Sequence, residues 1–551
     1  MRQRRKFEVW SVISILLLAC FLLFFVYPIC TLLRRAFVNE GGKFTVENFV
    51  KFFSKKYYYG TILNSFKVSI CVTIVSLIIG IVFSYFYSFF RLKGAKFLLV
   101  ASILCCMSAP FIGAYAWILL LGRSGVITNF LKLLGINIGS IYGFWGILLV
   151  QATKLYPLVL IYMNGMFRNL DNSLMEASAN LGCKGIKRFF KVVLRLSMPT
   201  VLAAALLVFM RAFADFGTPL MMGEGYRTFT VEIYNQFLSE TGSNYNFASA
   251  ISVIAVLLTA VIFLIQKFAT KKFSFTMNAL HPVEKKDAKG LGGVLMHIFC
   301  YGIVAISALP QLYIIYVSFR NSVNGVFQEG YSLANYREAI DKLLLRATGN
   351  TVIVGVLALA LAGIILLAIM ISYLTVRRPS ILNHTIDTVS MLPYIMPGSV
   401  IAIALLSTFS RKPLVLTGTL AIMIIAVIIR RLPYTTRSAT ATLIQIPMSI
   451  EEASISLGAS KMKTFFRITV PMMSSGIVSG AILSWVSIVT EVSSAVILYN
   501  NRSITLTVGT YSAISRGNFG AAAAFATVTT VLTALSLVVY MRVTKSENIE
   551  L

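Results

Sequence analysis

The sequence predicts an all-α protein that crosses a membrane many times. Of its 551 residues, 57% are hydrophobic and only 13% are charged, whereas about 25% charged residues are usual in soluble proteins. Apolar runs such as 11–30 and 351–374 approach or exceed the roughly 20 residues that a helix needs to cross the hydrocarbon core. A transmembrane β-barrel would instead show alternating segments of about 10 residues. The expected fold is therefore a polytopic bundle of helices.

Twelve transmembrane helices are expected, six in each half of the chain. The first run follows a basic start that resembles a signal peptide, but it is too long and lacks a small-residue cleavage site. We therefore expect it to remain as the first span. Proline residues interrupt two spans, at Pro110 and at Pro393 with Pro397, and either a functional bend or plain helix irregularity would explain them. The expected spans are 10–32, 59–90, 97–121, 141–165, 198–222, 247–266, 294–317, 348–376, 381–409, 414–435, 472–499 and 518–541.

Basic residues predict the orientation of these spans. Lys and Arg gather in loops on one side, for example at 91–96, after Gly182 and after Gly458. Such loops stay in the cytoplasm, so an even number of spans puts both termini there. The same loops account for the net charge of +29. Binding to nucleic acid is therefore not expected, and the lipid bilayer is the expected surrounding.

The two halves of the chain repeat each other. The interval from Glu176 to Glu452 is the same as the interval from Gly182 to Gly458. Because six spans separate equivalent points, the repeats run in the same direction and are related by an axis along the membrane normal. The predicted parts are a first unit at 1–266, a cytoplasmic linker at 267–293 and a second unit at 294–551.

One short segment of the repeat is especially informative. This doubled segment reads "MEASANLGCKGIKRFF" from Met175 to Phe190 and "EEASISLGASKMKTFF" from Glu451 to Phe466, in the long predicted cytoplasmic loops at about 166–197 and 436–471. A Glu in an opening turn suits the positive end of a helix, and the Gly permits a left-handed turn that ends one. A basic piece with a Phe pair follows. A single such helix would also suit lipid headgroups, but two equivalent copies favour docking to a two-fold partner.

This segment resembles the EAA loop of permeases from binding-protein-dependent ABC importers. The whole chain then resembles two fused permease units of the type I (MetI-like) fold, and each loop would seat a coupling helix on an ATP-binding subunit. The second copy keeps the Pro of the family pattern, whereas the first has Arg195 there and Pro199 four residues later. The resemblance assigns coupling to Glu176, Ala177, Ser178, Gly182, Phe189, Glu452, Ala453, Ser454, Gly458, Phe465 and Pro471.

The resemblance also implies partners. The chain has no phosphate-binding loop of the form G-x-x-x-x-G-K-[ST], so it is not expected to be an enzyme, and a homodimeric ATP-binding subunit would use ATP and magnesium. A separate extracytoplasmic binding protein would deliver the solute. The seven cysteines and three histidines lack metal-ligand spacing, so no metal or other cofactor of the chain's own is expected. The implied location is the cytoplasmic (inner) membrane of a bacterium.

Ferric iron is the expected solute. The segments "FADFGTPLMMG" from Phe213 and "TEVSSAVILY" from Thr490 resemble those of fused ferric iron permeases. Permeases for 2-aminoethylphosphonate, polyamines and thiamine are similar enough to remain alternatives. A remoter alternative is an ion-coupled secondary transporter, since parallel six-span repeats also occur there.

Two acidic residues, Asp215 and Glu491, stand at equivalent positions deep in predicted spans. Ionisable groups at such depth are costly unless they are paired or wetted. They would therefore either line the translocation pathway, where they would attract a cation, or be neutralised within the protein. Arg211 lies one helical turn before Asp215 and would be its partner in the second case. The sequence leaves both possibilities open.

Overall fold

The computed structural model describes residues 9–39, 41–238, 244–272, 283–323, 325–361 and 363–544. The predicted cytoplasmic termini at 1–8 and 545–551 and the interior of the predicted linker, 273–282, lie outside the described residues. The described chain is helical almost throughout. Its strands form two small sheets, in which β1 (Phe90–Arg91) pairs in parallel with β2 (Lys286–Asp287), and β3 (Arg320–Val323) pairs antiparallel with β4 (Val326–Tyr331).

Membrane-spanning helices dominate the described part of the chain. Eight helices are long and apolar enough to cross a membrane, or up to 11 if each of three bent helix pairs is one span. The helical membrane fold is thus confirmed, while the count of twelve stays a prediction. The bent pairs are Gly185–Leu196 with Met198–Phe213 (74°), Ile381–Ile395 with Gly398–Thr408 (112°), and Lys461–Met472 with Ser474–Val489 (66°).

The chain forms two compact units, and each contains parts of both sequence repeats. The first span of each half belongs to the unit built mainly from the other half. The boundaries predicted for the repeats themselves, at 266 and 294, stay a prediction. Within the described residues, unit 1 covers the ranges Met1–Lys51, Ile233–Val256 and Ser318–Asn548, and unit 2 covers Phe52–Glu232 and Leu257–Val317.

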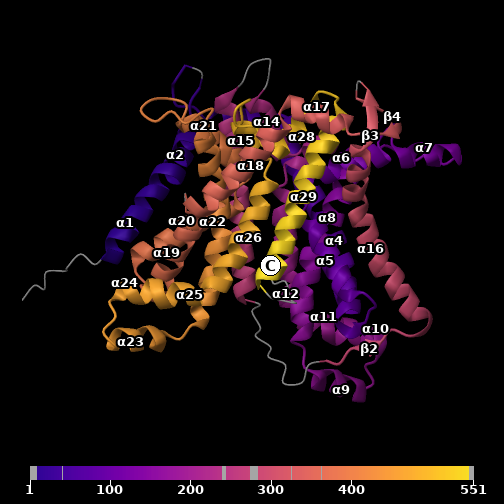
Figure 1. The fold of residues 1–551 in the computed structure, drawn as a ribbon, viewed down its shortest axis with the longest axis horizontal. Helices are drawn as coiled ribbons and strands as arrows, with labels where there is room; N and C mark the ends of the chain where they lie inside the picture. Colours follow the sequence, from indigo (N-terminus) through magenta and orange to yellow (C-terminus); the bar gives the residue numbers. More distant parts are fainter. Residues whose placement is uncertain are drawn as a thin grey trace, which may run out of the picture. The chain divides into compact units, whose positions relative to one another are not determined.

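Unit 1 holds most of the second repeat together with the N-terminal helix of the chain. That helix is continuous through α1 (Val9–Phe21), the π-helical turn η1 (Leu22–Val26) and α2 (Tyr27–Ala36), and it contacts α20 and α21 (Figure 1). The other elements of unit 1 are α17 (Ala334–Lys342), α18 (Leu344–Val356), η3 (Leu357–Leu361), α19 (Ile364–Arg377), α20 (Ile381–Ile395), α21 (Gly398–Thr408), α22 (Leu420–Gln445), α23 (Met448–Ser456), α24 (Lys461–Thr464), η4 (Phe465–Thr469), α25 (Val470–Met472), α26 (Ser474–Val489), α27 (Ala495–Leu498), α28 (Leu506–Ser515), α29 (Phe519–Thr544), β3 and β4.

Ring packing and one buried hydrogen bond fasten the N-terminal helix within unit 1. Trp10 is 4% exposed and packs on Tyr373 of α19 and Phe465 of η4, with ring centroids 4.6 and 5.0 Å apart. The hydroxyl of Ser14 donates to the side-chain oxygen of Asn383, 2.8 Å away. Because Phe465 belongs to the second copy of the doubled segment, this helix contacts the base of that segment directly.

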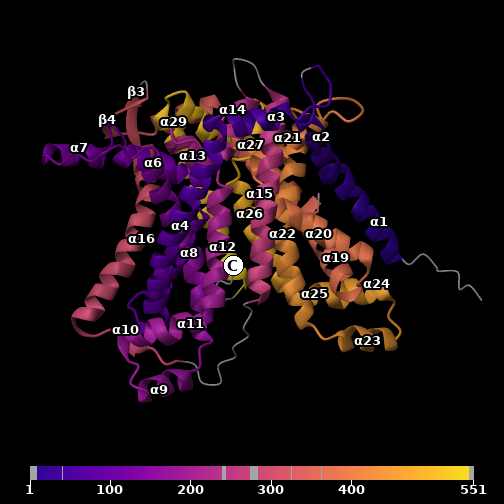
Figure 2. The ribbon, with the colours of Figure 1, turned by 180° about the vertical axis from the view of Figure 1, so that it is seen from behind.

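Unit 2 holds most of the first repeat together with the first helix of the second repeat. That helix, α16 (Gly290–Ser318), runs beside α4 (Figure 2), and Phe299 meets Phe86 with ring centroids 5.8 Å apart. Three further helices are divided between the units, namely α3 (Glu47–Ser54), α14 (Phe229–Phe237) and α15 (Tyr245–Lys272), whereas α16 has only its last residue, Ser318, in unit 1. The other elements of unit 2 are α4 (Lys56–Phe89), α5 (Ala95–Met107), α6 (Pro110–Leu121), α7 (Val126–Leu133), α8 (Phe144–Arg168), α9 (Asn172–Asn180), α10 (Gly185–Arg188), η2 (Phe189–Val193), α11 (Leu194–Leu196), α12 (Met198–Phe213), α13 (Gly217–Met222), β1 and β2.

The end of the linker is attached to unit 2. Its strand β2 pairs with β1, which directly follows α4. Just before β2, the ammonium of Lys285 donates to the carbonyl of Tyr87 at 3.0 Å. Burial, with Arg168 nearby, lowers the pKa of Lys285. The chain is thus held against the end of α4 before it enters α16.

Equivalent hydrogen bonds occur in the two units, as duplication requires. In unit 2 the side-chain amide of Asn64 donates to the carbonyl of Arg227 at 3.1 Å. In unit 1 the amide of Asn350 donates to the carbonyl of Arg502 at 2.9 Å. The two repeats therefore share internal contacts as well as sequence.

Candidate functional site

The first doubled segment folds into a short helix that ends in a glycine turn. The amide of Gly182 donates to the carbonyl of Ala179 at 3.0 Å, and that of Cys183 donates to Ser178 at 2.9 Å. These two bonds define a Schellman turn, which needs a left-handed residue directly after the C-cap. Gly182 supplies it with φ +77°. The helix α9 therefore ends where the sequence predicted.

The second doubled segment ends in the same turn. The amides of Gly458 and Ala459 donate to the carbonyls of Ile455 and Ser454, at 2.9 and 3.1 Å. Gly458 has φ +88°, and an added Cβ at Gly182 or Gly458 would meet nothing within 4 Å. The left-handed backbone, and not a lack of space, is therefore what requires glycine at both positions.

The two helices begin earlier than the sequence suggested. The carboxylate of Asp171 caps α9 by accepting from the amide of Ser173 at 2.9 Å. The helix α23 begins after Pro447. Glu176 and Glu452 are consequently the fifth residues of their helices and not part of the opening turn, because a cap and a proline upstream set the starting points.

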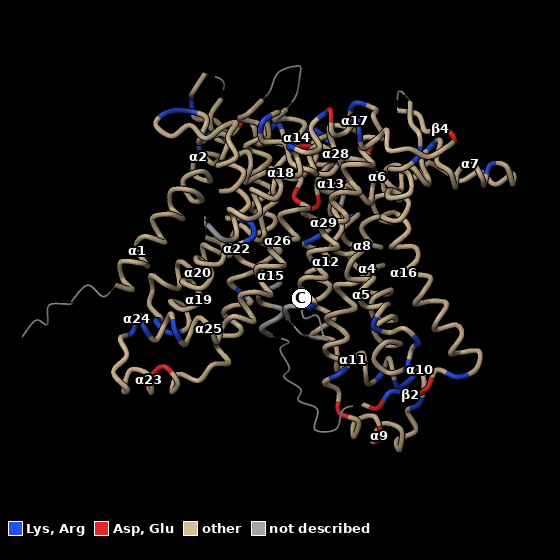
Figure 3. The backbone as a smooth tube through the Cα atoms, viewed as in Figure 1, with Lys and Arg blue, Asp and Glu red and all other residues tan. Residues whose placement is uncertain are grey.

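Each of these helices has a buried side and an exposed side. Ser178 and Ser454 are each 8% exposed, whereas the Glu and Ala that precede each of them are exposed: Glu176, Ala177, Glu452 and Ala453. Figure 3 shows acidic residues on α9 and α23 and basic residues on α10 and α24, as the sequence indicated.

The tips of the helices carry a residue that the sequence analysis missed. Leu181 and Leu457 are 86% and 89% exposed, directly before the glycine turns. Both copies of the segment read Leu-Gly at this point, and that repetition was the available signal. A single exposed leucine is ordinary at a protein surface, but its presence at both equivalent tips makes these two residues candidates for contact with a partner.

A phenylalanine anchors each segment to its unit. Phe189 of η2 meets Tyr85 of α4 with ring centroids 4.8 Å apart. Phe465 of η4 meets Tyr373 of α19 at 4.7 Å, again edge to face. Both contacts join the segment to a long membrane helix, so movement of the segment would be passed to that helix. After each phenylalanine the helix bends before the next span, by 74° in the first copy and by 66° in the second. Pro471 is present only in the second copy, so this proline is not required for the bend.

In unit 1 the base of the doubled segment also contains a buried ion pair. The Nε of Arg377 lies 2.9 Å from Oε1 of Glu451, with side chains only 8% and 6% exposed. Arg377 also donates to the carbonyl of Ile446 at 2.6 Å, and the hydroxyl of Tyr373 donates to Glu451 at 3.3 Å. These bonds fix the first turn of α23 to the end of α19.

In unit 2 apolar side chains take the same place. Met175, the counterpart of Glu451 in the repeat, is 4% exposed and belongs to a cluster that includes Phe167. Phe89 follows Tyr85 by four residues, as Arg377 follows Tyr373, and its ring packs 5.5 Å from that of Phe167. The two helices are thus held at equivalent points by different chemistry.

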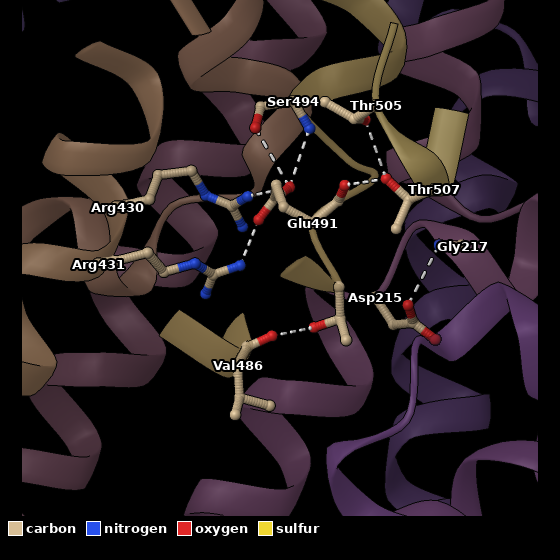
Figure 4. A network of polar contacts seen from close by, with 10 residues as sticks. Asp215, Gly217, Arg430, Arg431, Val486, Glu491, Ser494, Thr505 and Thr507 are labelled. Atoms are coloured by element: carbon tan, nitrogen blue, oxygen red, sulfur yellow. Dashed lines mark hydrogen bonds and ion pairs between the residues drawn. The ribbon is translucent and has the colours of Figure 1, made fainter. Parts of the chain in front are cut away.

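Glu491, just after α26 in unit 1, is held by two arginines. Its carboxylate forms ion pairs with Arg430 and Arg431 of α22, and it accepts from the amide and hydroxyl of Ser494 at 3.1 and 3.2 Å. Figure 4 shows these groups around the carboxylate. The side chain is 4% exposed, so the arginines compensate a charge that would be costly at this depth. The sequence analysis did not identify these partners, which lie far back in the chain on another helix.

Asp215 in unit 2 has neutral partners instead. Its carboxylate accepts from the side-chain amide of Gln151 at 2.9 Å. It also accepts from the backbone amide of Gly217 at 3.1 Å, the contact drawn in Figure 4. It forms no ion pair within the described part of the chain. Arg211 lies in the last turn of α12 and is exposed. A pathway role for Asp215, Glu491 and Arg211 stays a prediction.

The loops after the two acids are fixed in the same way. The hydroxyl of Thr230 donates to the carbonyl of Asp215 at 2.9 Å, and that of Thr507 donates to the carbonyl of Glu491 at 2.6 Å. Across the described ranges, no group of three or more His, Cys, Asp or Glu side chains could hold a metal ion.

Comparison of the sequence with known proteins identifies a family model and several similar permeases. The family model described as "Binding-protein-dependent transport system inner membrane component" matches residues 76–275 and 364–546. The ferric transport system permease protein FbpB of Actinobacillus pleuropneumoniae is 28% identical over 537 residues, which cover 96% of this chain and 77% of that protein.

Shorter relatives match about half of the chain. The spermidine/putrescine transport system permease protein PotB of Haemophilus influenzae is 29% identical over 46% of this chain and 91% of its own length. The protein named "Putative 2-aminoethylphosphonate transport system permease protein PhnU" of Salmonella typhimurium is 24% identical over 48% of this chain and 92% of its own length. This chain is therefore similar in length to about two such proteins.

The ion pair under α23 and the apolar packing under α9 lead to a prediction for unit 1. Glu451→Met or Arg377→Phe alone leaves one buried charge without its partner, which costs about 3–5 kcal/mol. The double variant recreates the residue pair of the first repeat and should recover most of this loss. Thermal denaturation of the purified protein in detergent would measure the coupling between the two sites. Additive losses would contradict the ion pair, and Glu452→Met, at an exposed neighbouring position, is the control.

Proposed function

We propose that this chain, which belongs to the family of binding-protein-dependent transport system inner membrane components, passes ferric iron from a solute-binding protein to the cytoplasm. Permeases of this family work with an ATPase and a binding protein. They are the membrane component and have no catalytic site or cofactor of their own. The family resemblance recognised in the sequence is thereby confirmed, and the ion-coupled secondary transporter is set aside.

One observation supports the proposal that the doubled segments couple this chain to the ATPase. Two helices at equivalent positions end in the same glycine turn, present an exposed leucine at the tip and are anchored by the same ring contact. One such helix would seat on each subunit of a homodimeric ATPase on the cytoplasmic side. The two termini would lie on that side as well.

The mechanism is alternating access driven by the ATPase. Closure of the ATPase dimer on ATP would move α9 and α23. The contacts Phe189–Tyr85 and Phe465–Tyr373 would pass that movement to α4 and α19, because a packed ring contact transmits displacement with little loss. The outer side would then open to accept solute from the binding protein, and hydrolysis would return the chain to the inward-facing state.

Ferric iron is favoured over the other solutes by the extent of the similarity. The ferric permease of Actinobacillus pleuropneumoniae matches both repeats within one chain, whereas the polyamine and phosphonate permeases match about half of it. Thiamine remains an alternative only from the sequence motifs. The ferric permease is 28% identical to this chain, and the solute is tested separately from the coupling.

The exposed leucines give the first test of coupling. A charged side chain at a buried interface position is strongly unfavourable, so Leu181→Asp with Leu457→Asp should abolish co-purification with the ATP-binding subunit and ATP-dependent uptake. Leu133→Asp on α7, where the leucine is also 86% exposed, should leave both unchanged. Normal co-purification and uptake by the double variant would overturn the coupling assignment.

The solute has a separate test. The cognate binding protein should bind ferric iron in isothermal titration calorimetry more tightly than 2-aminoethylphosphonate, spermidine or thiamine. Proteoliposomes that contain the complete importer should then accumulate iron only when ATP is supplied. Tight binding of another of these solutes, with no binding of iron, would replace iron in the proposal.

A further inference from the structure

A lysine stands in the middle of a membrane helix in unit 2, beside a small polar cavity. Lys154 is the eleventh of the 25 residues of α8. The cavity has a volume of about 20 Å³, enough for one or two water-sized groups. Its polar lining consists of Lys154, Ser108, Thr153, Ser307 and Gln311.

The ammonium of Lys154 lacks a direct partner in the described chain, where it forms neither a hydrogen bond nor an ion pair. The nearby charged groups that act on it include Asp215 and Arg211, which have opposite signs. The carboxylate of Asp215 is engaged by Gln151 and Gly217. Asp215 is therefore a nearby counter-charge that does not contact the ammonium. An anionic oxygen in the cavity would give Lys154 a direct partner at a depth where a poorly compensated cation is costly.

The cavity lies where a span is interrupted. Ser108 directly follows α5, and the 12-residue helix α6 begins two residues later, with Gly113 in its first turn also lining the cavity. The N-terminus of a helix carries partial positive charge and free amide groups. In transporters, such half-helix ends face anionic groups of the solute. The N-terminus of α6 and the ammonium of Lys154 thus both favour a negatively charged ligand.

The second repeat also has a basic residue beside the start of a helix in an interrupted span, and there the basic residue is paired with a carboxylate. Arg430 is the counterpart of Lys154, because the two are separated by the interval that relates the doubled segments. It lies against Gly398 at the start of α21, where an added Cβ would be 2.5 Å from its Nη1. There the basic residue forms an ion pair with the carboxylate of Glu491 (Figure 4). The counterpart of Glu491 in unit 2 is Asp215, whose carboxylate is bound by Gln151 and Gly217 and not by Lys154. In unit 1, unlike unit 2, the basic residue thus holds a carboxylate directly.

We propose that the cavity at Lys154 binds an anionic oxygen of the transported solute, as found in phosphate, phosphonate and carboxylate groups. This inference rests on the proposed importer function and narrows its substrate class. Iron would cross together with an anionic ligand and not as a bare cation, and a polyamine would be rejected. The small cavity admits one oxygen of such a group, while the rest of the solute lies outside it.

Binding to the detergent-solubilised permease tests this inference without the ATPase. The probes are inorganic phosphate, 2-aminoethylphosphonate, citrate and spermidine, and the readouts are ligand-dependent thermal shift and calorimetry. At least one anion should bind, and Lys154→Gln should weaken it on the order of tenfold or more, as loss of a charge-assisted hydrogen bond predicts. Lys154→Arg should retain binding, and spermidine should not bind.

The matched control is Lys67→Gln in the same unit. Lys67 belongs to α4, and its ammonium lies 5.2 Å from the centre of the Phe144 ring, away from the cavity lining. This variant should bind the anion as the unchanged protein does. Equal affinity in Lys154→Gln, or no anion bound by the unchanged protein, would overturn the site and leave a water molecule as its occupant.

Failure of this site and failure of the proposed function give different results. Loss of anion binding in Lys154→Gln with normal co-purification of the ATP-binding subunit would support the site alone. An importer that binds an anion but accumulates no iron would refute ferric iron while leaving the Lys154 site intact. Of the four probes, the anion that binds most tightly identifies whether phosphate, phosphonate or carboxylate is the group recognised.

Discussion

The left-handed backbone at Gly182 and Gly458 is the constraint on which the functional arrangement depends. A residue with a Cβ disfavours this conformation by about 1–2 kcal/mol, so glycine ends each helix at a defined residue. The turn directs the chain into a basic segment whose phenylalanine packs on a long membrane helix. Without the turn, the exposed ends of α9 and α23 would not be held in a fixed position relative to the phenylalanines that anchor them. A rigid tip is what a coupling element needs, since a flexible one would absorb the movement of its partner.

Local features of the fold and site could be predicted from the sequence, whereas features that depend on distant partners could not. The glycine turns, the amphipathic segments and the duplication are encoded by neighbouring residues or by a fixed interval. The starting points of α9 and α23 depend on Asp171 and Pro447, which the repeated motif does not include. The arginine partners of Glu491 are distant in the sequence and lie on another helix, and no local pattern encodes the register between those helices. The same applies to the exchange of the first span between the two units.

The two repeats have kept their backbone while their chemistry has diverged. Under the second doubled segment an ion pair, Arg377 with Glu451, takes the place of apolar packing under the first. Removing one partner of a buried ion pair leaves an uncompensated charge, so α9 and α23 differ in what would disturb them. The intramembrane charges differ as well. Glu491 is paired with two arginines, whereas Asp215 and Lys154 form no ion pair within the described residues. The proposed site at Lys154 would favour anionic groups over cations.

Site-specific photo-crosslinking from position 457 tests the central claim most directly. A photoreactive phenylalanine analogue replaces Leu457, the importer is assembled with its ATP-binding subunit in membranes, and the crosslinked product is identified by mass spectrometry. The account predicts a product with the ATP-binding subunit, formed equally from position 181 and absent from position 133. Products with lipid alone from positions 181 and 457, in a complex that still transports, would contradict it.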